Sequence, residues 1–289
     1  MSDINIHHSI AAADPWVSLR AFTPARIALG RTGTAIPLQE VLQFRMAHAH
    51  ARDAVHSLLD TDSLITQLQA FPITVNLLQS QAADRYTYLQ RPDKGRRLHE
   101  ESAGLLSSPD NDGAPQTVSI ILADGLSATA VNRNTIPLLA ILLPMLQEAG
   151  IALTPLSIVQ QGRVAIGDEI GSLLNATLTV VLIGERPGLS SPDSLGIYLT
   201  YHPQVGLTDE ARNCISNVRP GGLSYQAAAN KLFWLIQEAM RMQLSGVGLK
   251  DNAGALLPNQ VPETATWNSN CTTQLSKDRC LPILSQGRS

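Results

Sequence analysis

Apolar positions in the first third of the chain recur at the spacing of helices. Over residues 37–60 they fall largely on one side of a helix, and the proline at position 37 suits its first turn. A second helical pattern covers about 63–81, and a third runs from after position 92 to about 106. No run typical of a strand occurs before residue 116, so residues 14–110 are predicted to be mainly helical.

Short, wholly apolar runs replace this pattern after the polar segment 107–115, which has the turn composition of a linker. Each run has the length of a buried strand, and helical stretches separate several of them. The predicted strands are 117–122, 155–160, 178–183, 195–201 and 213–218, and the two clearest helices run from after 125 to 149 and from 224 to about 244. Strands that alternate with helices favour an α/β fold. Residues 116–249 are therefore predicted to form a Rossmann-like parallel sheet domain, preceded by the N-terminal helical part.

The two ends of the chain carry no sustained period. Residues 1–13 are short and polar, and residues 250–289 are polar and contain proline. We predict a mobile N-terminus and a poorly ordered C-terminal tail, because neither segment offers an apolar face to pack.

Composition narrows the classes of function. Charged residues make up 16% of the chain, against about 25% in an average soluble domain. We interpret this as a large share of surface removed from water, by the core or by a partner chain. The net charge of −3 and the aromatic content of 4% favour neither nucleic-acid nor membrane-surface binding. No apolar run approaches the roughly 18 residues that a membrane helix needs.

The distribution of reactive side chains predicts no metal ligand and no catalytic residue. The three cysteines are Cys214, Cys271 and Cys280, an odd count that favours a reducing, cytoplasmic compartment. No histidine neighbours the last two, and the histidines near position 50 match no metal-site spacing. Ser127 with Asp124 is not a nucleophile pair, since neither a histidine nor an oxyanion loop lies near them in sequence.

Three segments at predicted strand ends suggest one ligand-binding surface instead. They occupy residues 162–164, 184–189 and 213–217. In an open α/β sheet the loops beyond the carboxyl ends of the strands form the ligand crevice. Glu185 could accept hydrogen bonds there from amides of a ligand, or it could simply cap the Pro-Gly turn that follows. Cys214 is either part of the same surface or a small core residue.

A stand-alone nucleotide-binding Rossmann oxidoreductase is the alternative hypothesis for such a sheet. The first predicted strand ends in Asp124-Gly125-Leu126-Ser127, which lacks the glycine spacing that lets a backbone approach a pyrophosphate. No Gly-rich loop with lysine occurs either. A third hypothesis is a purely structural partner that stabilises another chain and contacts no cofactor.

Several ordered segments resemble those of a known family. They include Thr23-Pro24-Ala25-Arg26, Arg91-Pro92-Asp93-Lys94-Gly95, Asp124-Gly125-Leu126-Ser127, Gly162-Arg163-Val164, Gly184-Glu185-Arg186-Pro187-Gly188-Leu189 and Cys214-Ile215-Ser216-Asn217. The similarity spans about residues 14–249. On these segments the chain resembles the small (light) subunits of ethanolamine ammonia-lyase, an adenosylcobalamin-dependent enzyme.

The resemblance implies a role as one subunit of a hetero-oligomeric lyase that converts ethanolamine to acetaldehyde and ammonia. A large (β/α)-barrel subunit would bind the substrate and carry the radical chemistry, with the corrin between the two subunits. Residues 14–110 would dock on that partner, and residues 116–249 would be the cobalamin-binding domain. The family pattern implies cobalamin contacts at Val164, Glu185 and Cys214. Because the sequence shows no acid–base or nucleophile constellation, we also expect the chain alone to be inactive.

Two further expectations follow from the resemblance. No Asp-x-His-x-x-Gly segment, whose histidine would replace the cofactor's own base on cobalt, occurs in the chain. The cofactor is therefore expected to stay base-on, with dimethylbenzimidazole on cobalt. Some relatives carry a longer N-terminal extension linked to packaging in a bacterial microcompartment. About a dozen residues precede the match here, so a cytoplasmic location with or without packaging stays open.

Overall fold

The computed structural model describes residues 14–106 and 116–250. The expectations for the segments 1–13 and 107–115, and for the tail beyond residue 250 with Cys271 and Cys280, lie outside the described residues. The helices are α1 (Leu38–His56), α2 (Thr61–Leu68), α3 (Arg85–Gln90), α4 (Glu100–Gly104), α5 (Ala128–Glu148), α6 (Ile166–Leu173) and α7 (Tyr225–Met242). The described ranges also contain four 3-10 turns: η1 (Val17–Phe22), η2 (Lys94–Arg96), η3 (Asp209–Ala211) and η4 (Gly246–Gly248).

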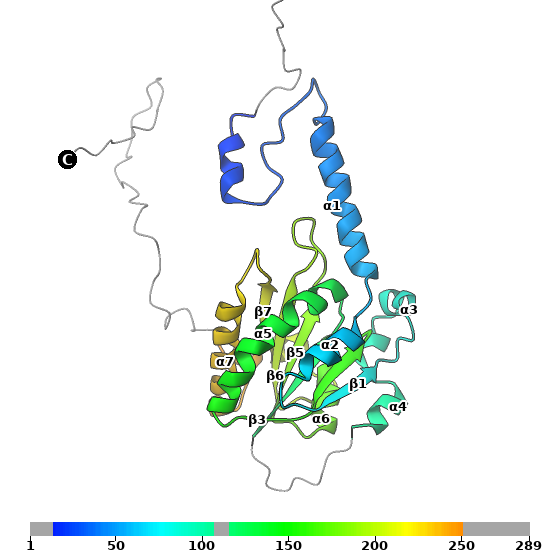
Figure 1. Ribbon diagram of the computed structural model, residues 1–289, viewed down its shortest axis with the longest axis vertical. Coiled ribbons are helices and arrows are strands. Elements are labelled where there is room, and N and C mark those ends of the chain that lie inside the picture. The colour runs from blue at the N-terminus through cyan, green and yellow to red at the C-terminus, as the bar shows by residue number, and fades with distance from the viewer. Residues whose placement is uncertain (1–13, 107–115, 251–289) are drawn as a thin grey trace, which may run out of the picture. The chain divides into compact units, whose positions relative to one another are not determined.

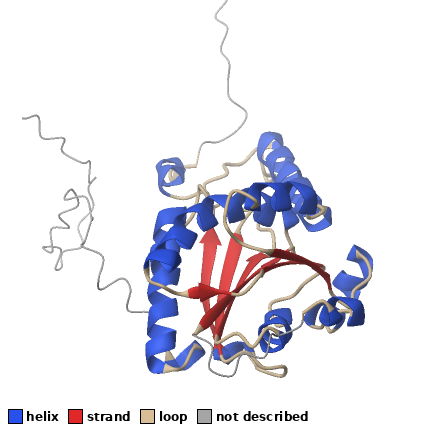
Figure 2. Cartoon of the chain, turned by 60° about the horizontal axis from the view of Figure 1, so that its bottom comes forward, coloured by secondary structure: helices blue, strands red, loops and turns tan. Residues whose placement is uncertain are grey.

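The centre of the molecule is one seven-stranded sheet with helices on both faces (Figure 1, Figure 2). Its strands are β1 (Val75–Gln79), β2 (Thr117–Ala123), β3 (Ala152–Leu153), β4 (Leu156–Gln160), β5 (Leu178–Gly184), β6 (Leu195–Tyr201) and β7 (Arg212–Val218). They lie in the order β1-β4-β2-β5-β6-β7, and the short β3 pairs with β2. The predicted α/β class is confirmed.

The sheet is mixed, so the expectation of a parallel sheet was wrong for one strand. β1, β4, β2 and β5 pair in parallel, whereas β6 pairs antiparallel with both β5 and β7. Residues 185–194 between β5 and β6 contain no helix. A parallel crossover needs a dozen or more residues, usually a helix, whereas an antiparallel neighbour can be reached through a short loop.

The expectation that residues 14–110 contain no strand was also wrong. β1 forms the edge of the sheet beside β4, with Leu78 opposite Val159. The sequence pattern predicted a helix through this segment, because Leu64 and Leu68 keep helical spacing just before it. Helix α2 ends at Leu68, and Pro72, which cannot donate to a helix ladder, lies between it and β1. The N-terminal part therefore contributes to the same sheet as the rest of the chain.

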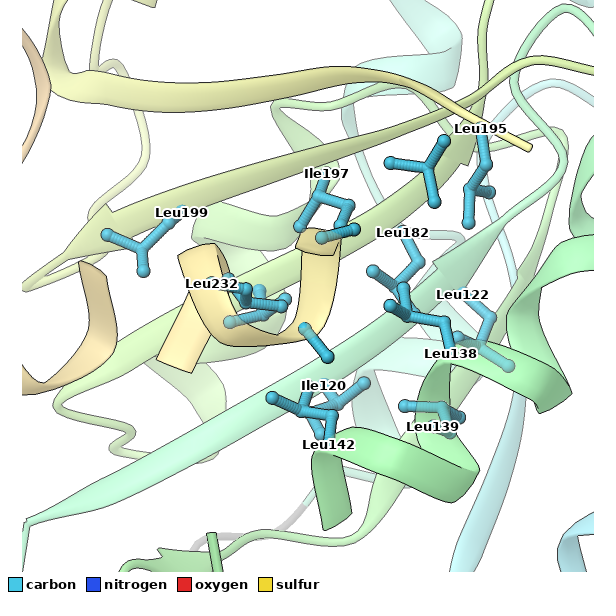
Figure 3. Packing of buried hydrophobic residues seen from close by; sticks show 14 of the residues in the cluster. Ile120, Leu122, Leu138, Leu139, Leu142, Leu182, Leu195, Ile197, Leu199 and Leu232 are labelled. Carbon is cyan, nitrogen blue, oxygen red and sulfur yellow. The ribbon is translucent and has the colours of Figure 1, made fainter. Parts of the chain in front are cut away.

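Alternation along the strands gives the sheet two apolar faces. On β2, Ile120 and Leu122 belong to the larger core cluster, while Ile121 and Ala123 belong to the smaller one. Helices α5 and α7 cover the larger cluster, and Figure 3 shows leucines of both helices against β2, β5 and β6. Helix α6 covers the smaller cluster over β2 and β5.

Helix α5 is the long central helix that the apolar pattern predicts. Ser127 caps it, accepting from the backbone N–H of Ala130 and donating its own hydroxyl to the carbonyl of Pro192 at 2.8 Å. By length and composition α5 is the one helix in the described ranges that could cross a membrane. Three leucines of α5, Leu138, Leu139 and Leu142, are fully buried. Helix α5 is therefore a core helix of the sheet domain.

Candidate functional site

A cavity of about 640 Å³ opens on the α6 face of the sheet. Its wall includes the turn after β2, the loop between β4 and α6, the end of β5, Tyr198 of β6 and the loop 205–209. The chain passes from β4 through α6 to β5 on the other side of β2, which makes this the topological switch point of the sheet. Open α/β sheets bind ligands at such points.

Asp124 holds the β4 end of the cavity in place. Its carboxylate accepts the backbone N–H groups of Gln161 and Gly162 at 3.0 Å each, and Arg85 lies 3.7 Å away. Burial raises the pKa of Asp124 to about 6, although these donors act in the opposite direction. The turn after β2 is thereby tied to the loop that carries Val164.

Close backbone approach positions the β5 end. The N–H of Leu126 donates to the carbonyl of Gly184 at 2.9 Å, so the β2 turn lies directly against the last residue of β5. A Cβ atom at position 184 would lie 2.0 Å from the carbonyl oxygen of Ser127. Only glycine fits there, and this contact places Glu185 at the cavity wall.

Glu185 presents a carboxylate that is only partly used by the protein. Its Oε2 accepts the hydroxyl of Ser194 and the backbone N–H of Asn217, the latter at 3.3 Å. Within the described residues its Oε1 makes no hydrogen bond. The side chain lies over Gly196, where a Cβ would come within 3.1 Å of Oε1. Glu185 therefore braces β7 and retains a free acceptor, and it does not cap the Gly188–Ser191 turn, which closes through its own backbone bonds.

Val164 lines the same cavity from the turn between β4 and α6. Its side chain is half-buried against the smaller core cluster. The predicted neighbours Val164 and Glu185 are therefore brought to one cavity, although they lie on different strand connections.

Cys214 is near the cavity but not part of its wall. It lies toward the amino end of β7, so its description as a strand-end residue was wrong, and it pairs across the sheet with Tyr198, which does line the cavity. The residue as a whole is exposed, and its thiol forms no disulfide. Desolvation raises the pKa of the thiol, while the hydrogen bond with Tyr198 and the charge of Lys231 lower it less. The group is therefore held as a thiol, not as a nucleophilic thiolate.

The sequence pattern missed several residues of the cavity wall. Tyr198 falls in an apolar run that looks like continuous core. The two-residue period of the strand separates it from its neighbour, because it puts Ile197 in the larger core and Tyr198 over the cavity. Tyr88, far away in sequence, arrives through its contact with Arg163. Strand alternation was the available signal for Tyr198, and no sequence signal was available for Tyr88.

The chemistry of the cavity is that of a binding site. Its described lining includes neither histidine nor cysteine. Burial raises the pKa of both lining tyrosines, that of Tyr88 to about 12. Among the described residues, no group of three or more His, Cys, Asp or Glu side chains could hold a metal ion. The fold and site define an α/β protein with a cavity at the switch point of its sheet, lined by carboxylates and arginines.

Comparison with known proteins identifies the family. A sequence model of the ethanolamine ammonia-lyase light chain matches residues 13–250. The ethanolamine ammonia-lyase small subunit of Azotobacter vinelandii is 56% identical over 246 residues, which cover 85% of this chain and 91% of that protein. The small subunits of Pseudomonas fluorescens and Pseudomonas aeruginosa are 56% and 53% identical over 83% and 89% of this chain, and 87% and 95% of theirs. The chain belongs to the ethanolamine ammonia-lyase light chain family.

Proposed function

We propose that this chain supplies part of the adenosylcobalamin site of an ethanolamine ammonia-lyase, while a large subunit holds the substrate. The observation that carries the proposal is the convergence of Val164 and Glu185 on one cavity at the switch point of the sheet. The family match favours a lyase subunit over the alternative of a stand-alone nucleotide-binding oxidoreductase.

The residues present fit the cofactor. Cobalamin carries neutral amide side chains around a flat corrin, and the unpaired Oε1 of Glu185 is an acceptor for an amide N–H. A cavity of about 640 Å³ suits a ligand of ordinary drug size, roughly 300–1,000 Å³, and is too small to enclose a whole cobalamin. Such a cavity supports a site that is shared with the partner subunit.

The chain's own residues would bind and orient the cofactor. Adenosylcobalamin, when bound, supplies the radical that starts the reaction. Val164 and Tyr198 would form the wall beside the corrin, with Cys214 next to Tyr198 on the neighbouring strand, and Glu185 would fix the rotation of the corrin through an amide. No proton transfer is assigned to this chain. Burial raises the pKa values of Tyr88, Tyr198 and the Cys214 thiol, so these three groups keep their protons at neutral pH.

The N-terminal segment supports docking on a larger subunit. Between residues 16 and 46 most large apolar side chains are exposed, among them Phe22 at 85% and Leu38 at 71%. A salt bridge of 2.7 Å between Arg20 and Glu40 ties η1 to α1, so these side chains belong to one connected surface. Exposed apolar patches of this kind mark protein–protein interfaces, and obligate interfaces are large and apolar.

Binding of cobalamin to the assembled complex tests the cofactor proposal. After co-expression with the large subunit, Glu185→Ala should lower cobalamin affinity by about tenfold to a hundredfold, the worth of a charge-assisted hydrogen bond. Glu185→Gln should lower the cobalamin affinity less, because the amide oxygen of glutamine can still accept a hydrogen bond from the cofactor. Glu100→Ala, at an exposed site on α4, is the matched control. Unchanged affinity in Glu185→Ala would leave Glu185 with only its bracing role.

Co-purification tests the docking proposal. Leu38→Asp should weaken association with the large subunit, whereas Val247→Asp, which alters a 79% exposed residue in η4, should not. Equal behaviour of the two variants in gel filtration would contradict docking through the N-terminal segment. The complex should release ammonia from ethanolamine only with adenosylcobalamin, and the chain alone should be inactive.

A further inference from the structure

We infer that Arg96 and Arg163 bind the phosphodiester in the nucleotide tail of cobalamin. The inference rests on the proposed function and adds a second contact region to the same cavity, on the wall formed by the loop after α3 and the loop after β4. It assigns to this chain the recognition of the tail, in addition to the contact with the corrin amides.

The charges around the cavity leave this wall cationic. Four arginines line the cavity, at positions 96, 97, 163 and 186, and the first three of them belong to this wall. Arg97 is paired with Glu169 at 3.0 Å, and the lining carboxylate of Asp168 is neutralised by Arg212 at 2.6 Å. Within residues 14–106 and 116–250, the other three arginines form no ion pair. The remaining lining carboxylates, Glu185 and Asp209, belong to the β5 end and the loop before β7.

Arg163 is held in a fixed position with donor capacity left over. Its guanidinium stacks on the ring of Tyr88 at 4.4 Å, and its Nη2 donates to the carbonyl of Tyr88 at 3.1 Å. Its Nε is buried and has no hydrogen-bond partner in the described structure. Arg85 stacks on the same ring at 4.7 Å, but its charge lies against Asp124. Arg163 is therefore the cation of this stack that faces the cavity without a counter-charge.

The backbone brings Arg96 to the same wall. The N–H of Arg163 donates to the carbonyl of Gly95 at 2.7 Å, and a Cβ at position 95 would lie 2.9 Å from Cγ of Arg163. Glycine permits this approach, and Arg96 follows directly in the chain. Arg96 is exposed and also lines the cavity, so two arginines from distant parts of the sequence line the same cavity.

The chemistry of the cofactor matches this arrangement. The peripheral side chains of the corrin are neutral amides, and the phosphodiester of the nucleotide tail is the one anionic group at its periphery. Guanidinium groups bind phosphate oxygens through paired, charge-assisted hydrogen bonds.

Comparison of cobalamin with cobinamide, which lacks the nucleotide and its phosphodiester, tests the inference. In the complex with the large subunit, Arg96→Gln should lower the affinity for cyanocobalamin by about tenfold, the loss expected for one charge-assisted contact. Its affinity for cobinamide should stay within about twofold of the unaltered complex. Arg163→Gln should show the same selectivity, and its cobinamide affinity checks that the fold is intact. Arg241→Gln, on the exposed surface of α7, is the control.

An equal loss for both ligands, or no loss for cyanocobalamin, would overturn the inference. Failure of the unaltered complex to bind cyanocobalamin would instead refute the proposed function. If cobinamide binds too weakly to measure, salt dependence decides. Added salt should weaken cyanocobalamin binding to the unaltered complex more steeply than to Arg96→Gln, because screening acts on the charge pair that the variant lacks. Equal slopes would count against the contact.

Discussion

The buried ion pair between Arg212 and Asp168 offers the most quantitative test of this structure. The pair is bidentate, at 2.6 and 2.7 Å, and both side chains are at most 3% exposed. Arg212 also donates to the carbonyl of Leu207 at 3.1 Å. One side chain thus connects β7, α6 and the loop 205–209 that closes the cavity.

Replacement of Arg212 by methionine would leave Asp168 buried without its partner. Breaking a buried pair in this way typically costs about 3–5 kcal/mol of unfolding free energy. The carboxyl group of Asp168 can lose its buried, unpaired charge by taking up a proton. From an unfolded pKa of 3.8 this costs about 4 kcal/mol at pH 7, at about 1.36 kcal/mol per pH unit. We therefore expect Arg212→Met to lower the free energy of unfolding by about 3–4 kcal/mol at pH 7.

The pH dependence of this loss has a definite sign. In the variant, the folded pKa of Asp168 lies further above the unfolded value, because burial raises it and the arginine that opposed this effect is gone. The folded variant then binds a proton that the unfolded chain does not. The loss of unfolding free energy in the variant, relative to the unaltered protein, should therefore shrink by up to about 1.4 kcal/mol per pH unit as pH falls from 7 toward 4.

Urea unfolding of both single variants and of the double variant Asp168→Leu/Arg212→Met measures the coupling. Replacing both charges with apolar groups removes the uncompensated charge, so the double variant should lie within about 2 kcal/mol of the unaltered protein. A loss below about 1 kcal/mol in Arg212→Met, or a double variant as unstable as the sum of the single variants, would refute the reasoning.

Three further changes test other parts of the structure. Gly184→Ala should destabilise by more than about 3 kcal/mol in urea unfolding because its Cβ meets the backbone of Ser127, whereas Gly104→Ala, with nothing within 4 Å, should be nearly neutral; similar stabilities would contradict this packing. The pKa of Asp124 is about 6 in the folded protein, against 3.8 in the unfolded chain. Proton uptake by Asp124 should therefore raise the free energy of unfolding as pH falls from about 7 to 4, and Asp124→Asn should remove this pH dependence. If the variant keeps the same pH dependence, another group is responsible for it. Cys214→Ser should keep most turnover in the assembled complex, while Cys214→Leu should lower cofactor affinity through a clash; abolished turnover in Cys214→Ser with cofactor still bound would show a chemical role for the sulfur.

The order of buried elements in the second part of the chain could be predicted from sequence alone. The runs that became β2, β5 and β6 are continuous or alternating apolar segments, and such local patterns persist in the fold. Helices α5 and α7 likewise follow their predicted spans. The resemblance drawn from several short segments also identified the family, because many matches in order are far more specific than one.

Pairing between distant segments decided the rest. The place of β1 at the sheet edge depends on β4, and the direction of β6 depends on the short loop before it; neither is encoded in local periodicity. Val164 and Glu185 share a cavity because Asp124 and Gly184 tie separate turns together. The cofactor contacts of Val164, Glu185 and Cys214 stay predictions. The stack of Tyr88 on Arg163 and the pair of Asp168 with Arg212 join residues far apart in the chain. Sequence pattern reports which side chains avoid water, whereas charge pairing and close backbone contacts depend on three-dimensional neighbours that only the folded sheet brings together.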